Sequence, residues 1–322
     1  MGHTYKIFLS GICGVFASLY VSAQDPNFTQ FYANPLYLNP ALAGNKICPR
    51  VNVSYRMQWP GVYGTYSTVG VSVDKLAYKL KGGIGLMIMN DRAAKGTLNT
   101  TGVGLVYAPT VALGKKVSAT AAIQAGYWQK TVNWSKLTFG DQIDPQRGFV
   151  NETNEVPDVQ SVANFDLAAG LLVSSKHLFA GAALHHILQP NESFLNGTSL
   201  LPRKLTVHAG ANIPLNSGSR YADEASISPN ILFQKQGDFT QMNLGLYAKK
   251  GAIVGGLWYR GNDSFIVLIG VEANGLKIGY SYDVTISKLT NASAGAHEVT
   301  LGYQFSCKVP KPKYRTGICP SW

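Results

Sequence analysis

The stretch EVTLGYQFS, residues 298–306, alternates between one apolar residue and one polar or small residue. This period of two is typical of a β-strand, because successive side chains of a strand point to opposite faces of the sheet. The same alternation recurs in residues 117–127, 204–213 and 276–283. The sequence therefore predicts an all-β protein in which many strands have one apolar face.

Turn signals divide the rest of the chain into similar segments. Short runs rich in Gly, Asn and Lys, such as AKKG at 248–251 and EANG at 272–275, mark hairpin turns. Between such turns we predict fourteen strands, at approximately residues 50–59, 65–75, 82–91, 97–109, 116–129, 161–174, 178–187, 203–213, 223–234, 240–249, 251–260, 263–272, 276–285 and 296–307.

Composition and loop lengths favour a membrane barrel over a soluble β-sandwich, whose strands would also alternate. Charged residues make up 14% of the 322 residues, against about 25% in a typical soluble domain. No apolar run long enough for a transmembrane helix follows residue 23. The three longest predicted connections, at 130–160, 188–202 and 286–295, are the fifth, seventh and thirteenth. Odd connections share one end of an antiparallel barrel, as the long outer loops of outer-membrane barrels do.

We therefore predict an all-β fold, a transmembrane antiparallel β-barrel of about fourteen strands. Lipid offers the backbone no hydrogen-bond partner, so a sheet within it must close, with its apolar face outward. Aromatic residues near strand ends are then expected at the two lipid–water boundaries. These residues are Trp59, Tyr63, Tyr66, Tyr127, Trp128, Trp258, Tyr259, Tyr280, Tyr282 and Tyr303.

The sequence divides into a predicted signal peptide, an N-terminal segment, a barrel and a C-terminal tail. Residues 1–23 have the basic start, apolar core and small-residue site of a signal peptide, cleaved after Ala23. We expect a segment at 24–49, the barrel at 50–307 and a basic periplasmic tail at 308–322. The net charge of +11 is not clustered on a nucleic-acid-binding motif. Export and alternation together predict an outer-membrane location, with no nucleic-acid partner.

The segment QDPNFTQFYANPLYLNPALAGN, residues 24–45, has neither strand nor helix period. Its prolines remove ladder hydrogen bonds, its Asn-Pro pairs favour turns, and its aromatic side chains need burial. We expect a compact unit in the periplasmic mouth or lumen of the barrel, acting as a plug or docking surface, or only as a lid. The candidate residues are Asp25, Pro26, Phe28, Gln30, Phe31, Asn34, Pro35, Tyr37, Asn39, Pro40 and Gly44.

This segment resembles the N-terminal signature of the PorP/SprF family of type IX secretion and gliding motility. The resemblance continues in YRMQWPG at 55–61, TYS at 65–67, GGIGL at 82–86 and the ND…GTLNTTG pattern at 90–102. It implies an outer-membrane barrel that helps to export or anchor a surface protein. The implied partners are the C-terminal sorting domain of that protein, periplasmic ring and motor components, and outer-membrane lipid. The alternative is a passive outer-membrane pore for small solutes.

Three cysteines follow the predicted signal peptide: Cys48, Cys307 and Cys319. The predicted topology places all three on the periplasmic side, where disulfides persist. Cys48 could pair with Cys307 or Cys319, Cys307 could pair with Cys319, or all three could be free thiols. No CxxC pair is present, so we expect no metal site and no cofactor.

The remaining polar residues point to a partner surface rather than to catalysis. The histidines His177, His185, His186 and His208 lack a G-x-S-x-G context, and alternation predicts opposite faces for His185 and His186. We expect no enzyme. The long loops are better suited to binding a partner, because they are exposed and carry aromatic anchors. The candidate residues there are Phe139, Asp141, Asp144, Phe149, Glu152 and Phe194.

Overall fold

The computed structural model describes residues 24–62, 64–114, 116–144, 146–153, 160–194, 197–215, 225–286 and 294–307. The predicted signal peptide, Tyr63, Cys319 and the basic tail lie outside these residues. Among the described residues, no helix is long and apolar enough to cross a membrane.

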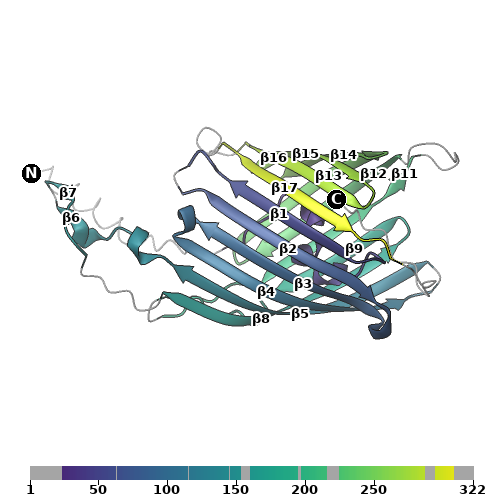
Figure 1. Ribbon diagram of the computed structural model, residues 1–322, viewed down its shortest axis with the longest axis horizontal. Helices are drawn as coiled ribbons and strands as arrows, with labels where there is room; N and C mark the ends of the chain where they lie inside the picture. Colours follow the sequence, from purple (N-terminus) through teal and green to yellow (C-terminus); the bar gives the residue numbers. More distant parts are fainter. Residues whose placement is uncertain are drawn as a thin grey trace, which may run out of the picture.

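Most of the described strands form one closed antiparallel barrel (Figure 1). The wall strands are β1 (Arg50–Gln58), β2 (Tyr66–Ala77), β3 (Gly82–Ala93), β4 (Leu98–Ala112), β5 (Val117–Val132), β8 (Ser161–Ser175), β9 (Leu178–His185), β10 (Lys204–Ala211), β11 (Ile213–Pro214), β12 (Ala225–Gln236), β13 (Phe239–Lys250), β14 (Ile253–Arg260), β15 (Ser264–Ala273), β16 (Leu276–Thr285) and β17 (Ala296–Gln304). The pairings of β1 with β17 and of β10 with β12 close the ring. Because the short β11 follows β10 directly and pairs with the same neighbour, β12, the barrel has 14 strands. The predicted fold class is confirmed.

The outward face of the wall is apolar, as closure in lipid requires. Along β15, the outward side chains Phe265, Val267 and Ile269 are 51%, 51% and 61% exposed, whereas Ile266 between them is buried. Comparable exposed apolar side chains recur on the strands around the ring. Such a continuous apolar surface is larger than a water-soluble monomer exposes.

The two ends of the barrel differ. At one end, here called the loop end, lie the connections after β5, β9 and β16 (Figure 1). The opposite end, the turn end, holds short hairpins such as the one at Tyr78–Leu80, together with the end of β17. The three longest predicted connections therefore share one end of the barrel.

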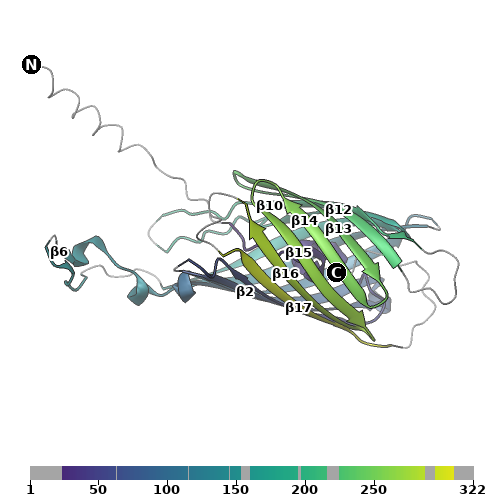
Figure 2. The same cartoon turned by 90° about the horizontal axis from the view of Figure 1, so that it is seen from above.

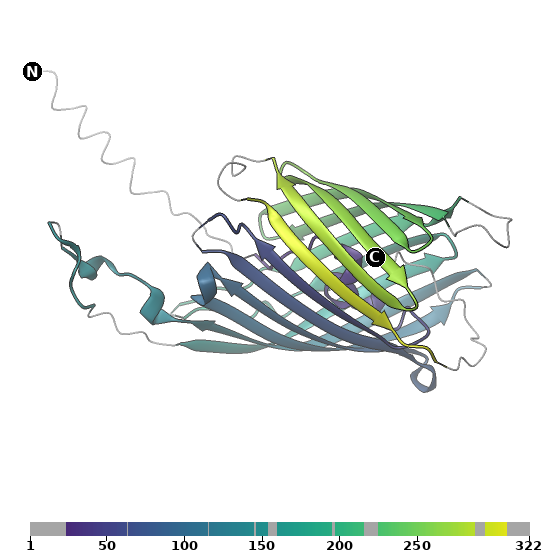
Figure 3. The same ribbon diagram turned by 45° about the horizontal axis from the view of Figure 1, so that its top comes forward.

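The wall is taller on one side. Strands β4, β5 and β8 have 15, 16 and 15 residues, whereas β9, β10 and β14 have 8 each. Figure 3 shows the long strands reaching beyond the others at the loop end. Their outward side chains are polar there, as in the hydrogen bonds from Asn90 to Asn99 and Thr101 and from Gln129 to Ser161. We call these loop-end parts of β3, β4, β5 and β8 the extended wall, because their polar outward face suits water rather than lipid.

Two of the predicted boundary aromatics are not at the boundary. Trp258 is 2% exposed, and Trp128 packs against the buried core inside the barrel. On β14 the neighbours Leu257 and Tyr259 face outward, so Trp258 must face inward. The prediction was wrong for these two because it used closeness to a strand end and ignored the alternation itself. By contrast, Tyr66, Tyr127, Tyr280 and Tyr303 are exposed.

Candidate functional site

Residues 24–49, here called the luminal segment, lie inside the barrel. Asp25 contacts Gln236 and His186, at the loop-end termini of β12 and β9. Gly44 contacts Asp74, near the turn end of β2. The segment therefore spans the lumen from one end to the other. The lumen is one of the two places where the sequence led us to expect this segment, and its first residue reaches cationic partners at the loop end.

The prolines and asparagines of the luminal segment give it three short helical turns: η1 (Phe31–Ala33), α2 (Pro35–Leu38) and η2 (Pro40–Leu42). Pro35 and Pro40 stand at the first helical position, where the missing N–H has no helical partner to lose. The Asn39 side chain caps η2 by accepting a hydrogen bond from the Ala41 N–H at 2.9 Å. The turns shorten the segment and bring its apolar side chains together.

Aromatic side chains of the luminal segment form the core of the molecule with inward side chains of the wall. Phe28 and Tyr37 meet edge to face at 5.3 Å between ring centroids, and the Tyr37 hydroxyl donates to the Pro26 carbonyl. Phe31 lies 4.9 Å from Trp258, also between ring centroids. Burying one large aromatic side chain contributes roughly 1.5–3 kcal/mol. The segment is thus held first by apolar burial.

The Asn39 amide also binds the wall. Its Nδ2 donates to the carbonyl oxygens of Leu171 and Ala182, at 3.0 and 3.3 Å, and lies 3.1 Å from His208 Nε2. Glycine makes this approach possible, because a Cβ at Gly170 would lie 2.2 Å from Asn39 Oδ1. One side chain therefore joins the segment to β8, β9 and β10.

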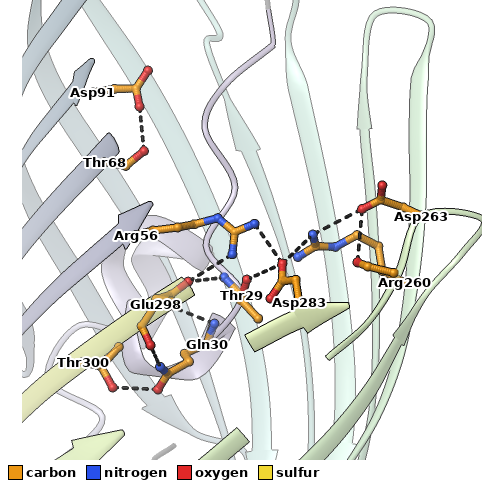
Figure 4. Close-up of polar contacts among 11 residues, drawn as sticks. Thr29, Gln30, Arg56, Thr68, Asp91, Arg260, Asp263, Asp283, Glu298 and Thr300 are labelled. Carbon is orange, nitrogen blue, oxygen red and sulfur yellow. Dashed lines mark hydrogen bonds and ion pairs between the residues drawn. The ribbon is translucent and has the colours of Figure 1, made fainter. Parts of the chain in front are cut away.

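A buried group of charges lies inside the wall near the loop end (Figure 4). Arg56 Nη2 is 2.9 Å from Asp283 Oδ2, and Arg56 Nη1 is 3.6 Å from Glu298 Oε2. Arg260 Nη1 lies 3.1 Å from the same Asp283 oxygen and 3.4 Å from Asp263. Charges buried in this way are stable only when each one has partners.

The luminal segment donates further hydrogen bonds to two of these wall residues (Figure 4). Thr29 donates from its hydroxyl to Asp283 at 2.9 Å and from its backbone N–H to Glu298 at 2.5 Å. Gln30 donates from its side chain to the Glu298 carbonyl at 3.1 Å and accepts from the Thr300 hydroxyl at 2.6 Å. Thr29 was not among the predicted residues. Charged residues with inward parity in predicted strands, such as Asp283 and Glu298, were the sequence signal that a partner must lie beside them in the lumen.

At the loop end, Asp25 and Asp166 enclose His186. The His186 ring nitrogens lie 2.8 Å from Asp25 Oδ2 and 2.6 Å from Asp166 Oδ2, and Lys204 Nζ lies 3.5 Å from Asp25. Burial lowers the pKa of His186, but the Asp25 charge and the hydrogen bonds to both carboxylates outweigh it and raise the pKa to about 10. Burial raises the pKa of Asp25, yet His186 and Lys204 hold it well below its usual value. His186 is therefore an imidazolium that donates to two carboxylates.

The predicted opposite orientation of His185 and His186 was wrong. Both residues are buried, and their ring centroids are 6.4 Å apart. Strand β9 ends at His185, and His186 has a φ of 55°, so the strand alternation stops between them. Of the other histidines considered, His177 is exposed at the turn end and His208 lies against Asn39.

At the turn end, the luminal segment is fixed by charge and by a covalent bond. Asp74 accepts from the Gly44 N–H at 2.7 Å and from Arg50 Nε at 2.6 Å. Cys48 forms a disulfide with Cys307, which follows β17. Of the pairings that the sequence left open, the structure contains this one, and it ties the segment to the β1–β17 seam. Cys319 lies outside the described residues.

The predicted partner-binding residues of the first long loop belong to a part of the chain that leaves the barrel. Residues 133–144 and 146–153 extend away from the barrel at the loop end and include the small hairpin of β6 (Ile143–Asp144) and β7 (Gly148–Phe149) (Figure 2). Phe139 stacks on Trp134 at 6.2 Å between ring centroids, and Asp141 accepts from the Thr153 hydroxyl. Asp144 accepts from two backbone N–H groups of its own turn, and Glu152 is exposed.

The described residues of the second long loop, 186–194 and 197–203, are fixed to the extended wall. Glu192 forms an ion pair with Lys130 of β5 at 2.7 Å, and Asn164 of β8 donates to the Asn191 carbonyl at 2.9 Å. Phe194 is half-buried in this loop. Sequence reasoning did not single out Lys130 or Glu192, because the alternation of a strand does not show which distant loop will contact that strand.

Comparison with known proteins identifies the family. The family described as type IX secretion system membrane protein PorP/SprF matches residues 20–303. The chain belongs to this family. A search of curated proteins gives no match. The resemblance found in the sequence is therefore confirmed, and this PorP/SprF chain has the family and fold of a secretion-system membrane barrel rather than of an enzyme.

Solved barrels are similar to this PorP/SprF chain at low identity. A FadL homologue of Pseudomonas aeruginosa is 10% identical, with a TM-score of 0.45 over 80% of this chain and 90% of that one. Omp33 of Acinetobacter baumannii is 8% identical, with a TM-score of 0.42 over 81% of this chain and 100% of that one. The KdgM porin is 9% identical, with a TM-score of 0.35 over 80% of this chain and 99% of that one.

Replacing Arg56 by Met should destabilise the barrel by about 3–5 kcal/mol, because Asp283 and Glu298 then share fewer buried cations. The free energy of unfolding, measured by urea titration in detergent, tests this. Lys249→Met is the matched control. Lys249 also pairs with a carboxylate, Glu272 at 2.7 Å, but its side chain is 32% exposed, so the loss should be at most about 1 kcal/mol. Equal losses for the two variants would contradict the prediction.

Raising the pH from 6.5 to 10 should weaken the contact of Asp25 with His186. The pKa of folded His186 is raised to about 10, so its contribution is complete below the unfolded value of about 6.5 and is lost as the pH rises towards 10. The free energy of unfolding should fall by roughly 2–4 kcal/mol more in the wild type than in His186→Gln. His177→Gln, at an exposed histidine, should behave as the wild type does. If all three proteins lose the same free energy, His186 is not held as an imidazolium.

Proposed function

We propose that this PorP/SprF barrel sits in the outer membrane with its loop end outside, and helps the type IX machinery to export or anchor a surface protein. Its partner at the loop end is the C-terminal sorting domain of that protein. The orientation follows from the rule that outer-membrane barrels have long loops outside and short turns in the periplasm. Cleavage of residues 1–23 after Ala23 belongs to the same proposal.

One observation supports a role in binding a macromolecule above all. The loop end is asymmetric, because the extended wall rises on one side and the 186–203 loop is fixed against it by Lys130 and Glu192. The first long loop extends further still, with half-buried Phe139 and exposed Glu152. Together they form an exposed, partly aromatic surface above the lipid, of the kind that binds folded partners.

The lumen beneath this surface is occupied along its length. The luminal segment is bound near the loop end by Asp25, in the middle by Asn39 and at the turn end by Gly44 and Cys48. The barrel thus acts as a rigid frame rather than as an open channel. The turn end, with the end of this segment and the basic tail, is the proposed face towards periplasmic ring and motor components, and gliding motility is the proposed setting.

A passive pore for small solutes is the alternative, and one observation favours it. Asn243 is 0% exposed, and within the described part of the chain neither polar atom of its side chain has a hydrogen-bond partner. Such atoms require water, so the lumen is not completely dry. Whether such water is continuous decides between the two functions.

Reversing the charge of Lys130 should reduce surface display of the cargo protein. Lys130→Glu places two carboxylates together and releases the 186–203 loop from the extended wall, whereas the double variant with Glu192→Lys restores an ion pair. Cargo on intact cells, measured by antibody labelling at equal barrel abundance, should fall several-fold in the single variant and recover in the double one. Lys249→Glu breaks an ion pair of the same 2.7 Å length at the turn end and should leave display unchanged. If the Lys130→Glu variant displays the cargo protein normally, the proposal that the loop-end surface binds the cargo is wrong.

The wild-type barrel should show no steady conductance in planar bilayers, because the luminal segment fills the lumen. A variant lacking residues 26–43 should conduct, since a barrel of about fourteen strands is wide enough for an aqueous channel when empty. Comigration with the wild type in the heat-dependent gel shift of folded barrels is the control for assembly. An open state in the wild type would favour the pore for small solutes instead.

A further inference from the structure

Exposed lysines gather at the turn end of the barrel, on three neighbouring turns of the wall. Strands β2, β3, β4, β5, β8 and β9 are consecutive neighbours in the sheet, so the turns that join β2 to β3, β4 to β5 and β8 to β9 lie side by side. We call residues 75–81, 111–114, 116–117 and 175–178 the turn-end collar. Its exposed lysines are Lys75, Lys79, Lys81, Lys116 and Lys176.

The positive charge of the collar is not balanced by nearby acidic residues of the described chain. At the turn end, the acidic side chains among the described residues are Asp74 and Glu272. Asp74 is buried in the lumen with its Oδ1 2.6 Å from Arg50 Nε, and Glu272 Oε2 lies 2.7 Å from Lys249 Nζ. The collar therefore presents a positively charged surface, which attracts anions.

Each turn of the collar also exposes a leucine within three residues of a lysine. Leu80, Leu113 and Leu178 are 51%, 58% and 62% exposed. Leu178 has the outward parity of its strand, because Phe179 beside it is buried inside the barrel. Apolar side chains beside cations suit a surface that is apolar on one side and anionic on the other, which is the boundary of an anionic lipid layer.

Two exposed tyrosines show where this part of the wall meets the lipid–water boundary. Tyr78 belongs to the first turn, and the hydroxyl of Tyr107 on β4 donates to the Leu80 carbonyl of that turn at 2.9 Å. Tyrosine is enriched at membrane boundaries because its ring is apolar and its hydroxyl is polar. A lysine at such a boundary extends its ammonium to the headgroups, while its methylene chain covers apolar surface.

We propose that the turn-end collar binds the headgroups of anionic phospholipids in the periplasmic leaflet of the outer membrane. The leucines and tyrosines lie in the boundary region, and the lysine ammonium groups bind the phosphates. An acidic protein or the cell-wall polymer would match the charge, but would leave the three leucines exposed to water. The inference rests on the membrane orientation given under the proposed function.

Lipid bound at the collar also sets the position of the loop end. Strands β4, β5 and β8 form much of the extended wall at the loop end, and their turns belong to the collar at the opposite end. Holding these turns at the level of the headgroups fixes the height of this side of the barrel. The extended wall is thereby kept above the lipid, where its polar outward face meets water.

The test measures the thermal midpoint of the full-length mature protein in a neutral detergent. Phosphatidylglycerol, which is anionic, or phosphatidylcholine, which has no net charge, is added in increasing amounts. A ligand that binds only the folded state raises the midpoint with its concentration, which yields an apparent dissociation constant. We expect phosphatidylglycerol to bind the wild type about tenfold more tightly or better, and about 1 M salt to remove the difference.

Replacing one lysine on each turn should abolish most of this preference. A basic residue beside an anionic surface contributes roughly fivefold in affinity. The triple variant Lys81→Gln, Lys116→Gln and Lys176→Gln should therefore raise the apparent dissociation constant for phosphatidylglycerol by about tenfold or more. Its binding of phosphatidylcholine should not change.

Two control variants separate charge from folding. Arg92→Gln with Arg147→Gln and Lys235→Gln removes the same charge from exposed residues of the loop end, and should bind phosphatidylglycerol as the wild type does. Arginine at the three collar positions keeps the charge and should also bind as the wild type does. Equal affinity of the collar and loop-end glutamine variants, or no preference in the wild type, would overturn the proposal.

Two further measurements distinguish lipid from other anionic partners. Leu113→Ser with Leu178→Ser leaves the charge unchanged and should weaken the binding of both lipids, so unchanged binding would contradict the boundary position of these leucines. Purified cell-wall sacculi are the second probe. Co-sedimentation that depends on the collar lysines, in a barrel without lipid preference, would assign the collar to the cell-wall polymer and overturn the proposal. Because the purified barrel is tested without cargo, this result and that of the cargo-display experiment are independent.

Discussion

The backbone of a strand in lipid has no hydrogen-bond partner except another strand, and the rest of this molecule depends on that constraint. It closes the sheet by pairing β1 with β17 and β10 with β12. A ring of this size leaves a bore wider than its own wall side chains can fill. The chain supplies the filling itself, in a segment that has no strand period and so cannot join the wall. The proline-rich luminal segment therefore fills the barrel, and the alternating segments that follow it in the sequence form the wall.

The lipid environment also determines where the charged side chains lie. The outward face carries apolar side chains through the membrane, and charged groups are turned inward, where Arg56, Asp283 and Glu298 pair with one another. The ion pairs alone leave carboxylate oxygens short of hydrogen bonds, and the luminal segment adds one bond from the Thr29 N–H and one from the Thr29 hydroxyl. The segment and the wall therefore stabilise each other. Buried polar groups of the segment and of the wall would lack hydrogen-bond partners without each other. Polar contacts between the two therefore occur at both ends and in the middle of the lumen.

Much of the wall could be predicted from the sequence, because alternation and turn residues are local signals. The strand number, the parity of the long loops and the nearness of Cys48 to Cys307 all follow from them. The contacts that could not be predicted are those between residues that are distant in the sequence. The partnership of Asp25 with His186 needed the segment to run through the lumen, and the ion pair of Lys130 with Glu192 needed a loop to fold back on the wall. Two errors were avoidable. Trp258 was predicted at the lipid boundary because the alternation of its strand was neglected. His186 was predicted to face away from His185 because alternation was extended beyond the end of the strand.

The position of the luminal segment in the chain has a consequence for biogenesis. It precedes β1, so it is made before any hairpin of the wall. Its buried side chains, such as Phe31, Leu36 and Leu42, interlock with inward groups on several strands. A segment shaped in this way could not be threaded into a finished cylinder without opening it. The geometry implies that, in the intact protein, the hairpins close around a segment that already lies between them before the last strand, β17, meets the first.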